Sequence, residues 1–205
     1  APTKGLFVRT VEHAGTHWYA VTTDSAGVED ATLEPGVNAA AEATQEVPAR
    51  VRPVWQRSNT SPQGEIYVLW GGDADTPTLP ALANAPNQPF LLGVKRGVPG
   101  GPLTVHGHGR GGTFFNSFVG AGLPGESVIA PDDHLDTEDG GSWYFGFHAG
   151  YDMEEPLNAP PTSGTVLDYG ERRVLALKDW SALELGHDPN RVYTLGSSMG
   201  GTFAV

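Results

Sequence analysis

The sequence predicts a mixed α/β domain with a mostly parallel sheet over residues 53–205, preceded by a β-rich segment at residues 1–50. Two observations predict this class. Short apolar strands alternate with loops and one long helix, and a strand that follows a helical crossover pairs in parallel with an earlier strand. The 28 glycines and 17 prolines of the 205-residue chain favour many turns over long helices.

The N-terminal segment shows the alternation of β-strands. Residues 5–11 (GLFVRTV) and 17–23 (HWYAVTT) alternate large side chains with small or polar ones, and EHAG lies between them as a turn. Residues 17–30 resemble the late strands of a fibronectin type III-like sandwich. A complete sandwich of that kind has about seven strands in about 100 residues, so the resemblance implies a partial β-sandwich at residues 1–50. An ordinary β-hairpin is the alternative interpretation.

The larger region contains five short apolar segments that predict strands. They are separated by stretches rich in Gly, Pro or Asp, which favour turns. The third segment ends in a glycine-rich loop and the fourth ends in two aspartates. The segments are residues 64–71, 89–96, 101–112, 126–133 and 191–195.

One long helix is predicted over residues 165–186. Val174, Leu177 and Trp180 are spaced three residues apart and form one apolar stripe, which is typical of a helix packed against a core. Gly186 is expected to end the helix, because glycine readily adopts the left-handed conformation that follows a last helical turn.

Charge and composition argue against several function classes. Twelve basic and 24 acidic residues give a net charge of −12, and such a chain repels nucleic-acid phosphates and anionic membranes. No run of about 18 apolar residues predicts a transmembrane helix. The lack of cysteine excludes disulfides and thiolate catalysis. We therefore expect neither a nucleic acid nor a membrane as a partner.

The strongest functional signal is the sequence GSSMG at residues 196–200. It fits the G-x-S-x-G pattern, in which Ser198 is a nucleophile on a sharp turn between a strand and a helix. Gly196 and Gly200 stand two residues before and two residues after the serine, where a Cβ atom would collide within the turn. The strand RVYTL before the motif and the small residues of GTFAV after it supply the expected context. A plain Ser-Gly turn is the alternative.

A second signal is the loop after the third strand, VHGHGRGG at residues 105–112. Acyl transfer needs two backbone N–H groups for the oxyanion, one from the residue after the nucleophile and one from a loop after an earlier strand. The sequence predicts Met199 as the first donor. It predicts His108, or Gly107 or Gly109 beside it, as the second. A flexible glycine loop with two solvent-facing histidines is the alternative.

Together these motifs resemble the α/β-hydrolase family, and specifically its secreted esterase and depolymerase-like members. The resemblance covers residues 100–205 and rests on TVHGHGRGG, SVIAPDD, SWYFGFHAGYD, VLDYGERRVLALKDW and DPNRVYTLGSSMGG, which follow the family's order. It implies an α/β-hydrolase-type sheet, acyl-enzyme chemistry on Ser198, and neither a cofactor nor a metal. The implied substrate is a small-molecule or polymeric ester, and the implied location is extracellular, in a bacterium.

The sequence departs from the family after the serine. The family's triad continues to an acid and then a histidine, whereas the seven residues after Ser198 include no Asp, Glu or His. We therefore expect an incomplete sheet, a missing C-terminal segment of the same protein as the partner, and no esterase activity of this chain alone. His134 or His148, in the loops after the fourth strand, is the alternative base, because triads are defined by geometry and not by order.

Three other functions are left open by the sequence. A serine peptidase would use the same fold and nucleophile. A non-catalytic binding or adhesion module would use the β-rich segment and the aromatic residues at 142–151. A metal-dependent hydrolase would use His106 and His108, although no further metal-binding residues follow closely.

The charged and aromatic clusters near the motifs also have structural interpretations. The acidic run at residues 131–141 does not match the spacing of a calcium loop and is expected to be a solvated loop. The aromatic run predicts core packing below the site, with a substrate pocket as the alternative. Arg173 is expected to pair with Asp168 or Asp179 along the helix. The acidic residues are Asp132, Asp133, Asp136, Glu138 and Asp139.

Overall fold

The computed structural model describes residues 11, 13–48, 52–70, 89–133, 142–150 and 162–204. The chain divides into two compact units. The smaller unit comprises Thr10–Arg50, and the larger unit comprises Ala1–Arg9 together with Val51–Val205. None of the helices in the described ranges combines the length and apolar character needed to cross a lipid bilayer.

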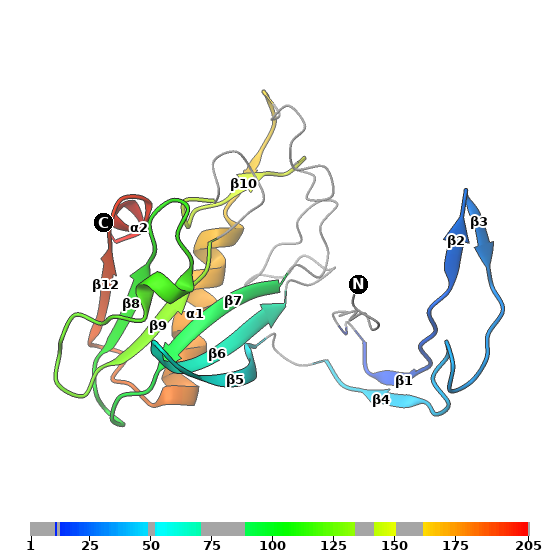
Figure 1. Cartoon of the computed structure of the whole chain (residues 1–205), viewed down its shortest axis with the longest axis horizontal. Coiled ribbons are helices and arrows are strands. Elements are labelled where there is room, and N and C mark those ends of the chain that lie inside the picture. Colours follow the sequence, from blue (N-terminus) through cyan, green and yellow to red (C-terminus); the bar gives the residue numbers. More distant parts are fainter. Residues whose placement is uncertain are drawn as a thin grey trace. The chain divides into compact units, whose positions relative to one another are not determined.

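The described part of the smaller unit contains four strands of three residues each, in two antiparallel pairs (Figure 1). One sheet pairs β1 with β4, and the other pairs β2 with β3. Two separate two-stranded sheets do not make a sandwich, so the predicted partial β-sandwich is not confirmed. The strands are β1 (Gly15–His17), β2 (Thr23–Ser25), β3 (Val28–Asp30) and β4 (Thr44–Glu46).

The strand predicted over residues 17–23 is divided in the structure. His17 ends β1 and Thr23 begins β2. Between them Ala20 forms an isolated bridge to Ala39, so the backbone changes partner within the predicted strand. The strand predicted at residues 5–11 lies outside the described residues, except for its last position.

A six-stranded sheet forms the centre of the larger unit, in the order β12-β8-β9-β7-β6-β5 (Figure 1). This unit is therefore a mixed α/β structure with a central sheet, and each of the five predicted strands is present. The sequence analysis does not predict β5. The strands are β5 (Val54–Thr60), β6 (Gln63–Trp70), β7 (Pro89–Lys95), β8 (Leu103–Gly107), β9 (Ser127–Pro131) and β12 (Val192–Gly196).

The prediction of a mostly parallel sheet is wrong for the described part of the chain. Three of its five pairings are antiparallel, namely β5 with β6, β6 with β7, and β7 with β9. Only β8 with β9 and β8 with β12 are parallel. The connection between β5 and β6 accounts for one of these pairings: it is a two-residue turn, and a turn that short permits only antiparallel pairing. Within the described ranges, the α-helical crossover on which the prediction rests occurs only before β12.

The helix α1 (Tyr169–Leu185) packs on one face of this sheet. Val174 and Leu177 of the predicted stripe are buried, and Trp180 packs edge-on against Tyr67 with ring centroids 5.2 Å apart. Gly186 ends α1 in the left-handed conformation, with φ 65°, as predicted. The stripe therefore joins α1 to the centre of the sheet. The buried core on this face consists of Tyr67, Leu69, Phe90, Leu92, Val94, Leu103, Val105, Ile129, Tyr144, Val174, Leu177, Leu185 and Met199.

A short 3₁₀ helix, η1 (Phe114–Ser117), helps cover the opposite face. The ring of Phe118 lies directly over Gly93 of β7, where a Cβ atom would overlap it. The buried cluster on this face consists of Ile66, Phe114, Phe118 and Ala130. The remaining elements of the unit are the hairpin of β10 (Phe147–His148) with β11 (Val166–Leu167), and the short helix α2 (Met199–Phe203).

Candidate active site

The turn from β12 to α2 places Ser198 at the point where the strand becomes a helix. Ser198 has φ 56° and ψ −122°, a positive-φ conformation that costs a residue with a Cβ atom about 1–3 kcal/mol. Hydrogen bonds from the Gly200 N–H to the Ser197 carbonyl (3.0 Å) and from the Gly201 N–H to the Ser198 carbonyl (2.8 Å) hold the turn. Ser198 is exposed, so its hydroxyl is accessible to a substrate.

Two glycines let this turn form against the end of β8. A Cβ atom on Gly196 would overlap the carbonyl group of Gly200, and one on Gly200 would overlap the carbonyl group of Gly107. The parallel pairing of β12 with β8 sets Gly196 beside Gly107. Because these contacts are with backbone atoms, no side-chain movement relieves them. Alanine at position 196 or 200 would therefore displace the turn.

The loop that follows β8 lies against the serine turn. A Cβ atom on Gly109 would lie 3.4 Å from the Ser197 carbonyl oxygen and 3.6 Å from Ser198 Cβ, which is ordinary van der Waals contact. Among the described residues, no backbone hydrogen bond takes the N–H of Gly109 or of Met199. These two N–H groups can therefore donate to a ligand.

The structure gives the other two predicted loop residues protein contacts. The N–H of His108 donates to the Tyr144 hydroxyl oxygen at 2.7 Å. Gly107 packs closely under α2, where a Cβ atom would lie 2.9 Å from the Phe203 ring and 3.2 Å from Gly200 Cα. The N–H of His108 therefore has an acceptor within the protein, whereas no hydrogen bond of the Gly109 N–H is found among the described residues.

The His108 imidazole is buried beneath the loop. Nδ1 lies 2.8 Å from the Gly109 carbonyl oxygen, and Nε2 lies 3.0 Å from both the Asp133 backbone nitrogen and Asp132 Oδ1. Burial opposes protonation, but hydrogen bonds to Asp132 and Gly109 and the charges of both aspartates outweigh it, so the pKa of His108 lies above its ordinary value. The neutral ring accepts from the Asp133 N–H, whereas the protonated ring donates to Asp132.

A buried ion pair lies next to this histidine. The side chains of Asp133 and Arg173 are each 1% exposed, and Arg173 Nη2 lies 3.1 Å from Asp133 Oδ1 and 2.9 Å from the Asp132 carbonyl oxygen. Asp133 also accepts the Ser142 hydroxyl at 2.5 Å and the Tyr144 N–H at 2.9 Å. One carboxylate therefore ties α1 and the segment after residue 141 to the end of β9.

The expectation of a solvated acidic loop is wrong for Asp132 and Asp133. Both are buried at the end of β9, where Arg173 donates to the Asp133 carboxylate and Asp132 Oδ1 lies 3.0 Å from His108 Nε2. The other three acidic residues of that run, at positions 136, 138 and 139, lie outside the described residues.

The expected ion pairs of Arg173 along the helix are also wrong. Its side chain faces the sheet and pairs with the aspartate after β9, as given above. Asp168 pairs instead with Arg172 at 2.8 Å, and Asp179 pairs with Lys178 at 3.1 Å. The two neighbouring arginines of α1 therefore form ion pairs in different places, Arg172 with Asp168 of its own segment and Arg173 with Asp133 after β9.

No histidine of the described ranges hydrogen-bonds to the Ser198 hydroxyl. Both ring nitrogens of His148 bond within their own loop, to the Ser163 carbonyl (2.7 Å) and the Gly150 N–H (2.9 Å). His134, the other alternative base, lies outside the described residues.

The two histidines of the alternative metal site each contact backbone atoms. His106 Nδ1 lies 2.5 Å from the Val119 carbonyl oxygen, and the His108 ring is held by Gly109 and Asp133 as described. In the part of the chain that the structure describes, no three His, Cys, Asp or Glu side chains are grouped as metal ligands. In this structure both histidines stabilise the loop after β8.

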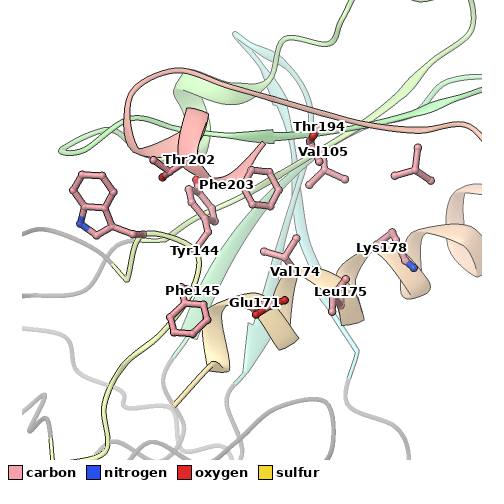
Figure 2. A pocket seen from close by; sticks show the side chains of 12 residues that line it. Val105, Tyr144, Phe145, Glu171, Val174, Leu175, Lys178, Thr194, Thr202 and Phe203 are labelled. Carbon is pink, nitrogen blue, oxygen red and sulfur yellow. The ribbon is translucent and has the colours of Figure 1, made fainter. Parts of the chain in front are cut away.

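A pocket of about 390 Å³ lies between α1, β12 and α2 (Figure 2). Its apolar walls include Trp143, Phe145 and Phe203, and α1 contributes Glu171 and Lys178 to its rim. Three residues of the predicted aromatic cluster, Trp143, Tyr144 and Phe145, line this pocket. Trp143 and Phe145 are 45% and 52% exposed, whereas Tyr144 is buried and also belongs to the core.

Tyr144, Asp133 and Arg173 lie near the turn, and the sequence analysis does not predict that they support it. The sequence does contain one indication of this support. Two aspartates directly follow β9, which pairs with β8, the strand that precedes the glycine-rich loop. The carboxyl ends of neighbouring parallel strands share one edge of a sheet, which is where sites form in α/β folds.

Two solved structures to which the chain is similar are hydrolases by name. An acetyl xylan esterase from Paenibacillus sp. R4 matches with a TM-score of 0.37 and 18% identity, over 76% of this chain and 48% of that one. An S-formylglutathione hydrolase from Agrobacterium tumefaciens matches with a TM-score of 0.39 and 15% identity, over 74% of this chain and 55% of that one. The chain thus spans about half the length of these structures. Both TM-scores lie below 0.5, a level from which neither fold nor activity transfers to this chain.

No family model matches the chain, and no curated protein matches it.

Proposed function

We propose that the chain carries the nucleophile and oxyanion loop of an α/β-hydrolase-type serine hydrolase that cleaves carboxylic esters. The observation that supports this best is the backbone of Ser198, which has a positive φ between β12 and α2 and lies close to Gly109, where an added Cβ atom would be 3.6 Å from Ser198 Cβ. Such conformations persist only where the surrounding structure enforces them, and they concentrate at reactive sites. Here Gly196 and Gly200 permit the close backbone approach, and the hydrogen bonds of the Gly200 and Gly201 N–H groups hold the turn.

In the proposed reaction the Ser198 hydroxyl oxygen attacks the ester carbonyl carbon while a base takes its proton. The N–H groups of Met199 and Gly109 donate to the oxyanion of the tetrahedral intermediate. The intermediate collapses, the alcohol leaves with the proton, and water then hydrolyses the acyl-enzyme to release the acid. His108 supports this loop instead of donating its own N–H, and no cofactor takes part.

The base and the acid that orients it are proposed to lie outside the described residues. This follows from the described histidines, none of which hydrogen-bonds to the Ser198 hydroxyl. We place both groups in a segment of the same protein C-terminal to Val205 and expect the 205-residue chain alone to lack esterase activity. The substrate class is a small-molecule or polymeric ester.

Covalent labelling by a fluorophosphonate, compared between Ser198 and the adjacent Ser197, tests the proposal. The chain, extended by any coding sequence that follows Val205, is treated with a fluorophosphonate and assayed with p-nitrophenyl acetate. Ser198→Ala is expected to abolish labelling and to lower turnover by at least about 10³-fold, because the acyl acceptor is lost. Ser197→Ala is the matched control, since this serine is also exposed and one residue away, and it is expected to retain both.

Other outcomes assign the site differently. Full turnover in Ser198→Ala would contradict the proposal. Cleavage of p-nitroanilides in preference to esters would indicate a peptidase, and activity lost to a chelator would indicate a metal-dependent reaction. Specific ligand binding without any covalent labelling would indicate a binding module.

A further inference from the structure

We propose that Tyr144 is a positioning residue for the oxyanion loop, an inference that rests on the proposed function. Its hydroxyl oxygen accepts the N–H of His108 at 2.7 Å and lies 3.3 Å from the Pro131 carbonyl, to which it donates. The loop has two adjacent N–H groups near the serine turn. By occupying the first, Tyr144 leaves the N–H of Gly109 as the donor for the oxyanion.

The position of Tyr144 depends on a strained backbone. Trp143 and Tyr144 have φ values of 56° and 59°, a left-handed conformation that bulky residues rarely adopt and that costs about 1–3 kcal/mol each. Two consecutive residues of this kind persist only where other contacts fix them. Apart from Ala26 in the smaller unit and Ser198 itself, they are the only non-glycine residues with a positive φ in the described ranges.

The contacts that fix the strained turn come from the buried ion pair. Asp133 accepts the N–H of Tyr144 at 2.9 Å and the hydroxyl of Ser142 at 2.5 Å, and Arg173 holds Asp133 in place at 3.1 Å. The start of α1 closes over the turn at Gly170, where a Cβ atom would lie 2.7 Å from Ser142 Oγ. A chain of direct contacts therefore runs from α1 through Asp133 and Tyr144 to the loop beside the nucleophile.

The ring of Tyr144 reaches both halves of the proposed site. It packs on Phe203 of α2 with centroids 4.8 Å apart and on the His108 ring with centroids 5.6 Å apart (Figure 2). Tyr144 is 3% exposed, so no bulk water stands ready to replace its hydroxyl as the partner of the His108 N–H. Removing that oxygen leaves the buried His108 N–H without an acceptor, which costs about 1–3 kcal/mol. We expect the loop to move so that this N–H finds another partner.

Amide hydrogen exchange tests this hydrogen bond without any assay of activity. In the unmodified 205-residue chain the His108 amide is expected to be protected and the Gly109 amide to exchange at least about ten times faster, since only the first has an acceptor. In Tyr144→Phe the His108 amide should exchange at least about ten times faster than in the unmodified chain. Tyr67→Phe is the matched control, because this buried tyrosine bonds to Glu65 and Arg96 instead. It should leave the His108 amide unchanged.

The kinetic arm uses the extended protein of the labelling experiment. Tyr144→Phe is expected to lower kcat about 10- to 100-fold with KM within about two-fold, because a misplaced oxyanion donor affects mainly the transition state. Titration with the fluorophosphonate counts active sites, so a loss of folded protein is not mistaken for a slower reaction. Unchanged His108 exchange, or an unchanged kcat, would overturn the role of Tyr144. If the unmodified protein never reacts at Ser198, the proposed function fails, while the exchange data still decide whether Tyr144 holds the loop.

Discussion

Two arginine clusters tie the two ends of α1 to the sheet, and they differ in burial. Near the start of the helix, Arg173 and Asp133 are each 1% exposed and form one ion pair of 3.1 Å. Near its end, Glu184 pairs with Arg96, which also bonds to Glu65 at 3.0 Å and to the Tyr67 hydroxyl at 2.8 Å. Arg96 hydrogen-bonds to three side chains and Arg173 to one, yet the side chain of Arg96 is 41% exposed.

From this difference we expect burial, and not the number of bonds, to decide how much such a cluster contributes to stability. Exposed ion pairs are screened by water and salt and contribute about 0–1 kcal/mol. A buried pair is costly to form, and removing one partner leaves a charge stranded in the interior at a cost of about 3–5 kcal/mol. The buried cluster lies beneath the serine turn and the loop, where a fixed position matters. The exposed cluster lies away from both.

The largest effect on stability is expected from a substitution that breaks the buried ion pair. Arg173→Met is predicted to lower the free energy of unfolding by about 3–5 kcal/mol, because the carboxylate of Asp133 loses its counter-charge while still buried. The stacking of the guanidinium on Phe90, 3.9 Å from the ring centroid, is lost as well. Urea denaturation followed by circular dichroism measures the change.

A double variant separates charge from packing at this site. Asp133→Asn combined with Arg173→Met is expected to be more stable than Arg173→Met alone, because the amide keeps an acceptor for the Tyr144 N–H and carries no charge. A loss below about 1 kcal/mol for Arg173→Met would contradict the role given to burial.

The second prediction concerns how the stability of this buried region depends on pH. The pKa of His108 is raised in the folded protein, so the imidazolium stabilises the fold fully below its unfolded pKa of about 6.5 and this contribution disappears as pH rises through the folded pKa. The stability advantage of the unmodified chain over His108→Gln should therefore be larger at acidic pH and decrease above about pH 6.5. Urea denaturation across that range measures it. An advantage that grows with pH would contradict the assignment of Asp132 and Asp133 as the charges that hold this ring.

Local sequence patterns account for what could be predicted of the fold and of the site. The predicted strands and α1 are encoded by runs and stripes of apolar residues, and the serine turn is encoded by two glycines within five residues. β5 escaped prediction because six of its seven residues are exposed, so its sequence shows no apolar alternation. Whether neighbouring strands pair in parallel or antiparallel depends on how the chain connects them, and the sequence of a single strand does not show this.

The support of the site could not be predicted because its contacts are distant in sequence. Tyr144 bonds to His108 across 36 residues, and Arg173 bonds to Asp133 across 40. An aspartate after a strand is compatible with either a solvated loop or a buried hydrogen-bond acceptor. Which of the two forms depends on whether another part of the chain places a donor beside it. Arg172 and Arg173 illustrate the same point, since adjacent identical residues face different surfaces.

The smallest effect on stability is expected from a substitution in the exposed cluster. Arg96→Met removes three side-chain partners at once, yet it is predicted to lower the free energy of unfolding by only about 0–1 kcal/mol, since water solvates Glu65 and Glu184 once the guanidinium is gone. The effect should shrink further in 1 M salt, where the Debye length is about 3 Å. Urea denaturation at low and high salt, beside Arg173→Met under the same conditions, measures both. A loss equal to that of Arg173→Met would mean that the number of partners outweighs burial, and the contrast between the two ends of α1 would be wrong.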